Sequence, residues 1–373
     1  MTKVFEDRPY QSRIITKSDV NWRAGVKRQL IVSPTGSGKT VMGFKVLKNV
    51  VENAPEIMKC EPNEVGIAWV AMRRNLLKQA EIENNLLIKC PNVHYVSMFD
   101  KDPMDELSQY KKLVIMLDEA HHDGADSAHS IHNKLNPLLY LGLSATQLRT
   151  DRVKLCFELT LQDAGYHNLI SDGYLSQFDQ FMLNEFTPAS VASAYLADVP
   201  KWGKSLMFFL TYQECFDCAA ILRSAGIRCD IVTSATDRYA QIDAFEAGEI
   251  DVLINMSVLT EGFDCPDLRT VWVRDSANRG PTMQMAGRVL RKHHSKPFAN
   301  IVQSVKTSYP FARVAKPHHQ YVQQNGVWRS IGASEMVRMM SNMMIQRVIK
   351  ADIDYESLNY LKNKQINHVH RWR

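Results

Sequence analysis

A glycine-rich turn between an apolar run and a helical pattern constrains this chain more than any other feature. The turn reads Ser-Pro-Thr-Gly-Ser-Gly-Lys-Thr over residues 33–40, after the apolar Leu30–Val32 and before an amphipathic pattern over Val41–Val51. Strand, turn and helix in this order predict a loop whose backbone N–H groups surround a phosphate at a helix N-terminus. We expect Lys39 to reach the β- and γ-phosphates and the Thr40 hydroxyl to hold Mg²⁺.

Six residues of this turn make up the predicted phosphate contact: Thr35, Gly36, Ser37, Gly38, Lys39 and Thr40. The strict pattern begins with Gly, where this chain has Ser33. A chance turn is the alternative, but the strand before it and the helix after it favour the phosphate-binding loop.

Length and composition are those of an ordinary globular chain. Its 373 residues are 45% hydrophobic, which allows two domains with sizeable cores. No apolar run approaches the roughly 20 residues of a membrane span, and the charged start of the chain lacks the apolar centre of a signal peptide. We therefore expect a soluble cytoplasmic protein that makes no membrane contact.

The seven cysteines predict reduced thiols. Cys215 and Cys218 form a C-x-x-C pair, but no second pair or histidine stands at the spacing of a zinc site. A helix face beside buried apolar residues is therefore favoured over a metal or redox site.

Basic residues gather in the last part of the chain. Residues 311–373 hold ten Lys and Arg against four Asp and Glu, a net charge of +6, whereas the whole chain carries +5. This charge predicts contact with a polyanion, and a solvated helical face is the alternative. A Met-rich helical pattern over 335–350 predicts either a face packed on the body of the protein or a surface for a protein partner.

Strand-like runs alternate with helical patterns in both halves of the chain, which predicts parallel sheets covered by helices. The expected strands are Gln29–Val32, Val65–Met72, His94–Phe99, Leu113–Leu117, Tyr140–Leu143, Ser205–Leu210, Arg228–Thr233, Val252–Asn255, Thr270–Val273 and Ile301–Val305. The expected helices are Val41–Val51, Arg73–Ile88, Tyr212–Ala225, Asp237–Ala247 and Thr282–Lys292. We expect a first domain over residues 1–172, a junction over 173–204, a second domain over 205–308 and a C-terminal extension over 309–373.

Two adjacent carboxylates follow one of the expected strands. Asp118 and Glu119 come directly after Val114–Leu117, which is apolar at every position, as in a strand buried on both faces. Ligands of open α/β sheets bind at the carboxyl ends of the strands, so these acids are expected to face the phosphate-binding loop. We expect Asp118 to hold Mg²⁺ and Glu119 to orient or deprotonate an attacking water. Two ordinary surface acids are the alternative.

An arginine-rich segment in the second half adds a third element. Gln284, Arg288 and Arg291 share one side of a predicted helix, at spacings of four, three and seven. Arginines that reach a γ-phosphate accelerate phosphoryl transfer by about 10³–10⁵. Taken alone, the segment also fits a solvated helix face.

In order and spacing, these segments resemble those of superfamily 2 helicases with Asp-Glu-Ala-His in motif II. The matching segments are Arg8–Gln11 (adenine recognition), Ser33–Thr40 (motif I), Val70–Arg74 (Ia), Asp118–His121 (II), Ser144–Thr146 (III), Phe208–Tyr212 (IV), Thr260–Asp264 (V) and Gln284–Arg291 (VI). Together they cover roughly residues 5–305. Motifs I, II and VI in combination are highly specific.

The resemblance implies an α/β protein of two tandem RecA-like domains, each a mainly parallel sheet flanked by helices, with a short helical C-terminal tail. It implies that ATP and Mg²⁺ bind between the domains and that a nucleic-acid strand crosses both. Arg8 and Gln11 would contact the nucleotide, with Gln11 reading the base. Gly262 and Asp264 would complete the nucleotide-binding set and link the cleft to the strand-binding face. The catalytic residues would be Lys39, Glu119, Gln284, Arg288 and Arg291.

The local sequence favours DNA over RNA as the track. Gln-x-x-Gly-Arg-Val-Leu-Arg in motif VI, Arg-Pro-Tyr-Gln near the start and Glu-Gly-Phe-Asp in motif V are similar to one branch of the superfamily. That branch holds branch-migrating DNA helicases, phage UvsW-type helicases and the motor subunits of restriction enzymes. RNA helicases with the same motif II usually differ in motif VI and lack the Gln11 element.

Two other functions stay open at this point. One is an ATP-gated nucleic-acid clamp, annealing or remodelling protein that separates few base pairs. The other is a motor subunit that acts inside a larger complex. A small-molecule kinase is disfavoured, because it leaves the second α/β half and the Gly-Arg-x-x-Arg segment without a role.

Overall fold

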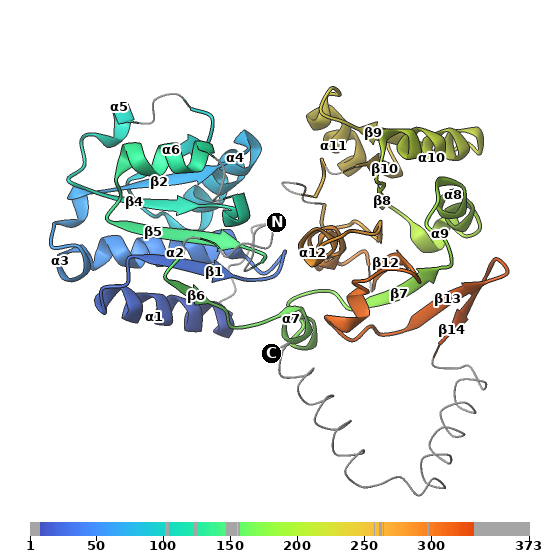
Figure 1. The fold of residues 1–373 in the computed structure, drawn as a ribbon, viewed down its shortest axis with the longest axis horizontal. Helices are drawn as coiled ribbons and strands as arrows, with labels where there is room; N and C mark the ends of the chain where they lie inside the picture. The colour runs from blue at the N-terminus through green and yellow to red at the C-terminus, as the bar shows by residue number, and fades with distance from the viewer. Residues whose placement is uncertain are drawn as a thin grey trace, which may run out of the picture.

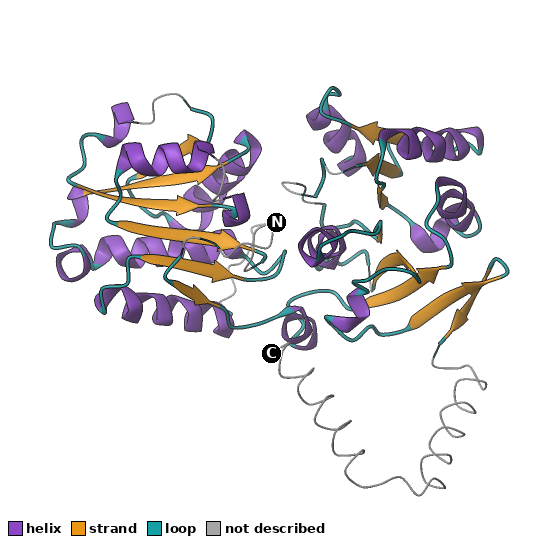
Figure 2. Ribbon diagram, in the orientation of Figure 1, coloured by secondary structure: helices purple, strands orange, loops and turns teal. Residues whose placement is uncertain are grey.

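Two sheets with helices packed on their faces organise the chain into two lobes that lie side by side (Figures 1 and 2). This computed structural model describes residues 8–331, apart from 101–103, 123–125, 147–154, 156, 257, 261, 262, 264 and 297. The α/β fold class expected from the sequence is confirmed.

The first sheet has six parallel strands in the order β3-β2-β4-β5-β1-β6. The strands are β1 (Arg28–Val32), β2 (Val65–Ala71), β3 (Val93–Ser97), β4 (Lys112–Leu117), β5 (Leu139–Ser144) and β6 (Leu159–Leu161). Every residue of β2 and β5 is buried, as expected for inner strands covered on both faces. The sequence predicted the first five strands, and β6 was missed.

Helices and short helical turns surround this sheet. The helices are α1 (Pro9–Arg23), α2 (Lys39–Glu52), α3 (Ala54–Ile57), α4 (Arg74–Glu83), α5 (Met104–Leu107) and α6 (Asp126–Leu135). The turns are η1 (Pro62–Glu64), η2 (Asn84–Ile88) and η3 (Ala120–His122). The predicted helix over 73–88 is confirmed as α4 followed by the π turn η2, which ends at Lys89 in a left-handed conformation.

The second sheet has eight strands in the order β14-β13-β7-β12-β11-β8-β10-β9. The strands are β7 (Phe178–Leu183), β8 (Ser205–Phe208), β9 (Cys229–Val232), β10 (Val252–Asn255), β11 (Thr270–Trp272), β12 (Ala299–Ser304), β13 (Gln320–Gln324) and β14 (Val327–Ser330). All neighbouring strands run parallel except β13 and β14, which form an antiparallel hairpin. The five strands predicted for this half are β8 to β12.

The helices of the second half follow the expected positions where the sequence pattern was clear. They are α7 (Tyr166–Ser171), α8 (Pro188–Leu196), α9 (Val199–Trp202), α10 (Tyr212–Ser224), α11 (Arg238–Glu246) and α12 (Arg279–Gly287), with the turns η4 (Arg288–Leu290) and η5 (Phe311–Arg313). The start of α10 has a capping box between Thr211 and Glu214. Cys215 and Cys218 lie in its buried face, as predicted, and burial raises the pKa of both thiols to about 12.

Two ranges differ from the expected organisation. The range 173–204, expected as a junction, contains β7, which pairs in parallel with β12 over its whole length. The expected extension 309–373 begins with η5 and the β13–β14 hairpin, which joins the same sheet. Its Met-rich part, 335–350, lies outside the described residues. The domain boundaries stay a proposal, and this pairing favours a second domain that begins near β7 and includes the hairpin.

A hydrophobic core continues from one lobe into the other. One cluster contains Trp69 of the first sheet, Tyr166 and Leu169 of α7, and Leu206 and Val271 of the second sheet. Figure 1 shows α7 in the connection between the lobes and α12 on the side of the second lobe that faces the first. Among the described helices, none combines the length and the apolar character needed to cross a membrane.

Candidate nucleotide site between the lobes

The glycine-rich turn connects β1 to α2. The Ser33 amide donates to the Ser144 carbonyl at 3.1 Å, which extends the pairing of β1 with β5 to the start of the turn. Gly36 and Gly38 have φ angles of +82° and +79°, a left-handed conformation that favours glycine. The helix begins directly after Gly38, and its first turn carries no acidic side chain. Its amides and partial positive charge are therefore available to an anion.

The residues of this turn fit a bound phosphate. The buried hydroxyls of Ser33 and Ser37 have no hydrogen-bond partner among the described residues. A Cβ on Gly38 would lie 2.7 Å from Nε2 of Gln11, so the turn leaves no room for a side chain there. Two serine hydroxyls and the backbone N–H groups of a tightly curved turn before Lys39 are hydrogen-bond donors of the kind that bind a triphosphate.

The acidic pair follows β4, as predicted. The Glu119 amide donates to Oδ1 of Asp118 at 2.9 Å, and Glu119 has a φ of +50°, which is uncommon for a residue with a side chain. Oε2 of Glu119 lies 3.5 Å from Nδ1 of His121. Backbone strain of this kind is typical of functional sites.

The charges of the two motifs act on each other. Burial and the neighbouring Glu119 raise the pKa of Asp118 to about 7, while the Lys39 ammonium opposes the shift. Burial also lowers the pKa of Lys39, and the carboxylates of Glu119 and Asp118 act in the opposite direction. Burial and the second acid thus disfavour the ionised form of Asp118. A divalent cation would supply the positive charge that stabilises this form.

The N-terminal element packs against the phosphate-binding loop. Nε2 of Gln11 donates to the Ser37 carbonyl at 3.0 Å, and the Tyr10 hydroxyl donates to the same oxygen at 2.5 Å. The Arg8 guanidinium lies over the ring of Tyr174, 5.3 Å from its centroid. The sequence prediction included Arg8 and Gln11 but missed Tyr10 and Tyr174.

Motif VI of the second lobe lies directly against this loop. A Cβ on Gly287 would lie 3.0 Å from Cβ of Thr35, and one on Gly36 would lie 3.4 Å from Cγ of Arg291. Nε2 of Gln284 is 3.5 Å from Nε2 of His121. The structure thus brings Gln284 and Arg291 to the two motifs of the first lobe that the sequence singled out.

Arg288 has a different environment. Its Nε donates to the Thr260 carbonyl and its Nη1 to the Phe263 carbonyl, both at 2.9 Å. The expectation that one helix carries all three motif VI side chains is wrong, because α12 ends at Gly287 and Arg291 has extended backbone angles. The Leu290 carbonyl accepts a hydrogen bond from the Ser176 amide at 2.7 Å, which holds the chain in this non-helical course.

Tyr166 is a residue of this site that sequence reasoning missed. Its hydroxyl accepts a hydrogen bond from the Thr35 amide and donates to the Met283 carbonyl, each at 3.3 Å. Its ring packs edge-on against Phe311. Nothing in the sequence around Tyr166 distinguishes it from a core aromatic, because its role depends on α7 lying between the lobes.

Further contacts join the lobes around the nucleotide site. Nη1 of Arg73, in motif Ia, donates to the Val258 carbonyl at 2.9 Å. A Cβ on Gly280, in the first turn of α12, would lie 3.4 Å from Cγ2 of Thr146 in motif III. Gly262 and Asp264, which were expected to bind the nucleotide, lie outside the described residues.

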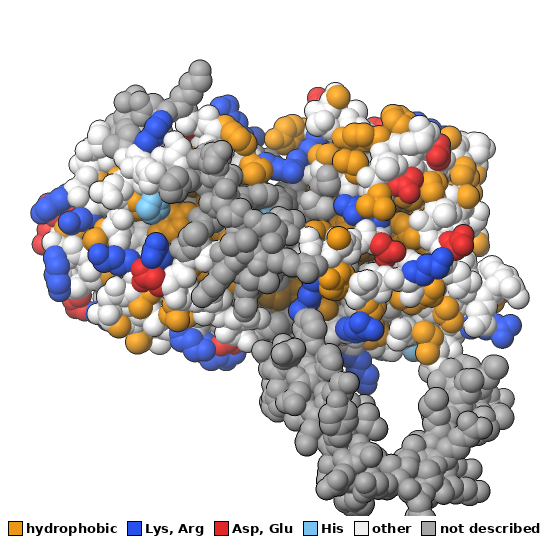
Figure 3. Space-filling model, in the orientation of Figure 1, with side chains coloured by type: hydrophobic (Ala, Val, Ile, Leu, Met, Phe, Trp, Pro, Cys, Tyr) orange, Lys and Arg blue, Asp and Glu red, His pale blue; other side chains and the backbone are white. Residues whose placement is uncertain are grey.

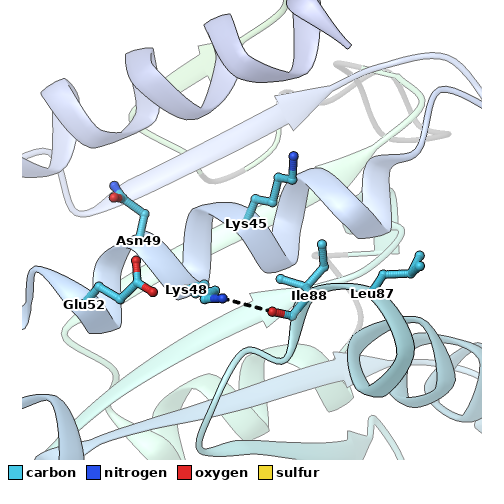
Figure 4. Close-up of a pocket in the computed structure, with 6 residues that line it drawn as sticks. All are labelled: Lys45, Lys48, Asn49, Glu52, Leu87 and Ile88. Carbon is cyan, nitrogen blue, oxygen red and sulfur yellow. Dashed lines mark hydrogen bonds between the residues drawn. The ribbon is translucent and has the colours of Figure 1, made fainter. Parts of the chain in front are cut away.

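A surface pocket of about 250 Å³ lies elsewhere on the first lobe. It is formed by α2 and η2, where Nζ of Lys48 donates to the Ile88 carbonyl at 3.1 Å (Figure 4). None of its lining residues belongs to the motifs described above, so it is separate from the nucleotide site.

Two protein families match the chain. The family "Type III restriction enzyme, res subunit" matches residues 4–94 and 83–149, and the "Helicase conserved C-terminal domain" matches residues 190–293. The first match covers the phosphate-binding loop and the acidic pair, and the second covers motif VI.

Individual proteins agree with these matches. IRC3 of Saccharomyces cerevisiae, named as an ATP-dependent helicase, is 25% identical over 358 residues, which are 81% of this chain and 52% of that protein. A protein of Sulfolobus islandicus filamentous virus named as helicase 22 is 26% identical over 363 residues, 79% of this chain and 63% of its own length. The chain therefore spans less than two thirds of either relative.

Two solved structures share the fold. The type ISP restriction-modification enzyme LlaBIII bound to DNA superposes with a TM-score of 0.56 at 13% identity, over 81% of this chain and 28% of that chain. Dbp5 of S. cerevisiae, bound to RNA and ADP BeF3, superposes with a TM-score of 0.51 at 15% identity, over 82% of this chain and 89% of that chain. The likeness to Dbp5, together with the two family matches, agrees with two tandem RecA-like domains.

Proposed function

The chain belongs to the helicases of superfamily 2, and on this premise we propose that it hydrolyses ATP between its two lobes and uses the hydrolysis to move along nucleic acid. The observation that carries this proposal is that the stem of Arg291 lies next to Gly36, since a Cβ on Gly36 would be 3.4 Å from Cγ of Arg291. It joins an arginine of the second lobe to the phosphate-binding loop of the first. A nucleotide bound there would touch both lobes, so its hydrolysis would change how they hold each other.

The first lobe would hold the nucleotide. The amides of Gly36 and Gly38, the Ser37 hydroxyl and the Lys39 ammonium would bind its phosphates, and Gln11 and Arg8 would contact its base. Thr40 and Asp118 would hold Mg²⁺, which would neutralise negative charge on the phosphates. The unpartnered Ser37 hydroxyl and the buried carboxylate of Asp118 support this set.

Glu119 is the proposed base or orienting group for the attacking water. Its carboxylate lies 3.5 Å from Nδ1 of His121. Gln284 of the second lobe contacts the other side of His121, with its Nε2 3.5 Å from Nε2 of the imidazole. A water held between these groups would be excluded from bulk solvent when the lobes are in contact.

The second lobe would add positive charge beside the phosphates of the nucleotide. Arg291 lies beside Gly36 and is the arginine best placed to approach a γ-phosphate. Arg288 holds the carbonyls of Thr260 and Phe263 and so supports motif V as well. Gly262 and Asp264 of that motif would relay the state of the nucleotide site to the nucleic acid.

DNA is the proposed track. Contacts to phosphate and sugar would dominate, since a motor that moves along a strand cannot depend on base identity. On the face shown in Figure 3, Lys and Arg side chains are spread over both lobes and do not form one patch. Since a basic patch or stripe is the usual mark of a nucleic-acid contact, the proposed contact would draw on charge beyond this face, including the basic C-terminal extension. The same extension is the proposed surface for any protein partner.

A motor module within a larger assembly is the second candidate. It is supported by the length of the similar proteins, because this chain matches only 52% of IRC3 and 28% of LlaBIII. In that case the isolated chain would hydrolyse ATP, but its full activity would need further domains or subunits.

The test is ATP hydrolysis measured without polymer, with single-stranded DNA, with forked DNA and with RNA, beside a strand-displacement assay. Stimulation by DNA, lost in Lys39→Ala and kept in Lys48→Ala, is the expected result. Lys48 is the matched control, because it lies on the same helix in the separate surface pocket. Stimulation without strand displacement would favour the clamp or the motor module, and hydrolysis by Lys39→Ala at the wild-type rate would contradict the proposal.

A further inference from the structure

Three side chains of metal-ligand type converge beside β7 of the second lobe. Asp179 is the second residue of β7, and His318 and His319 directly precede β13. Oδ1 of Asp179 lies 3.6 Å from Nδ1 of His318 and 3.4 Å from Nδ1 of His319. We propose that Asp179, His318 and His319 form a binding site for a divalent transition-metal ion, Zn²⁺ above all.

The distances suit a metal ion. Zn²⁺ binds imidazole nitrogen and carboxylate oxygen at about 2.0–2.2 Å, which places neighbouring ligands of a tetrahedral site about 3.3–3.6 Å apart. Both nitrogen-to-oxygen distances fall in or near that range. All three ligand atoms lie within 4.8 Å of one another, which would let one ion contact all three.

The backbone fixes these ligands relative to one another. The His318 amide donates to the Phe178 carbonyl at 2.8 Å, and the Gln180 amide donates to the His319 carbonyl at 2.9 Å. Asp179 lies between these two bonded positions. Asp179 therefore lies on a strand, and the two histidines lie in the short segment that leads into the neighbouring strand β13 and is bonded to β7 on both sides of Asp179.

Outer contacts orient two of the ligands further. The His319 amide donates to Oδ1 of Asp179 at 3.0 Å. The His318 ring stacks on Phe298, with centroids 4.4 Å apart and planes at 14°. Metal sites characteristically have such supporting contacts, which hold the ligands in place before the ion binds.

The donor set selects the class of ion. Two imidazoles and one carboxylate suit Zn²⁺ and its neighbours in the transition series, whereas Mg²⁺ prefers oxygen ligands alone. The side chains are exposed to 18% at Asp179, 41% at His318 and 50% at His319, so an ion can enter from solvent. Water would occupy the remaining coordination positions. The site is thus chemically distinct from the Mg²⁺ site proposed beside the nucleotide.

An ion here would join segments that are far apart in the chain. Asp179 and His319 are 140 residues apart, and His319 directly precedes the β13–β14 hairpin at the edge of the sheet. A bound ion would therefore hold the hairpin against β7 and stabilise the second lobe.

The test is Zn²⁺ titration of the full chain, with any affinity tag removed, by competition with a chromogenic chelator. We expect one site of micromolar affinity and a rise in melting temperature of about 2–5 °C with excess Zn²⁺. Asp179→Asn and His319→Gln should each weaken binding at least tenfold. His294→Gln is the matched control, because His293 and His294 also form an adjacent pair, and no carboxylate among the described residues pairs with either.

Bound Co²⁺ gives a second readout, since its visible absorption distinguishes tetrahedral from octahedral ligands. A tetrahedral spectrum that His319→Gln abolishes would support the site. The proposal is overturned if the wild type binds no Zn²⁺ at micromolar concentration, or if Asp179→Asn and His319→Gln bind it as the wild type does. Circular dichroism of these surface variants checks that they fold.

Discussion

Gly287 of α12 lies against Thr35 of the phosphate-binding loop so closely that a Cβ on Gly287 would come within 3.0 Å of Cβ of Thr35 and 2.6 Å of the Tyr166 hydroxyl. The absence of a side chain at Gly287 is therefore what allows motif VI to meet the nucleotide loop. Both lobes contribute to this contact, and its closeness determines how near Arg291 can come to a bound triphosphate.

Gly287→Ala should separate the two motifs. The added methyl group needs space that Thr35 and Tyr166 occupy, so we expect kcat for ATP hydrolysis to fall about tenfold or more. Gly165→Ala is the control, because its added Cβ would meet no atom within 4 Å. Steady-state ATPase assays check both variants, and equal rates for the two would show that this contact does not limit hydrolysis.

Tyr166→Phe should destabilise the protein. The change keeps the ring but removes the hydroxyl that bonds the Thr35 amide and the Met283 carbonyl, and it leaves two buried backbone groups without that partner. Such a loss costs about 1–2 kcal/mol of unfolding free energy. Urea unfolding measures it, with Tyr239→Phe as an exposed control. A loss no larger than that of the control would mean that the hydroxyl does not hold the lobes together.

Asp118 should make stability depend on pH. Its pKa is raised from 3.8 to about 7, so between these values the folded protein holds a proton that the unfolded chain releases. Its contribution to stability therefore falls as pH rises from about 4 to 7 and is constant above that. In EDTA, Asp118→Asn should gain about 1–3 kcal/mol relative to the wild type between pH 4 and pH 8. Urea unfolding at both pH values tests this, and a difference independent of pH would contradict it.

Much of the nucleotide site could be predicted because its motifs are local. The turn over 33–40 has strand and helix patterns on either side of it, and the acidic pair directly follows an apolar run that predicts a buried strand.

Two features of the second lobe were not predictable in this way. The buried strand β7 contains Asp179 and Gln180, which interrupt its apolar pattern. Gln180 is tolerated there because its amide donates to the Ile301 carbonyl at 3.2 Å, a contact that only the sheet creates.

The end of α12 shows the same limit of local patterns. Val289 and Leu290 continue a helical spacing of apolar residues, so the sequence favours a helix through Arg291. Tertiary contacts end the helix earlier. The Ser176 amide donates a hydrogen bond to the Leu290 carbonyl, and the Ser176 hydroxyl donates one to the Arg291 carbonyl at 3.0 Å. The resulting extended conformation brings the stem of Arg291 to Gly36.

Nucleic-acid-stimulated ATP hydrolysis by Arg291→Ala tests most directly whether both lobes hold the nucleotide. Arg223→Ala is the control, because Arg223 is an exposed arginine of α10 that lies outside the motifs and outside the basic extension. If one nucleotide is held by both lobes, kcat should fall at least about 10²-fold while KM for ATP changes by no more than about threefold. The control should keep the wild-type kcat. A wild-type kcat in Arg291→Ala would contradict a nucleotide site shared between the two lobes.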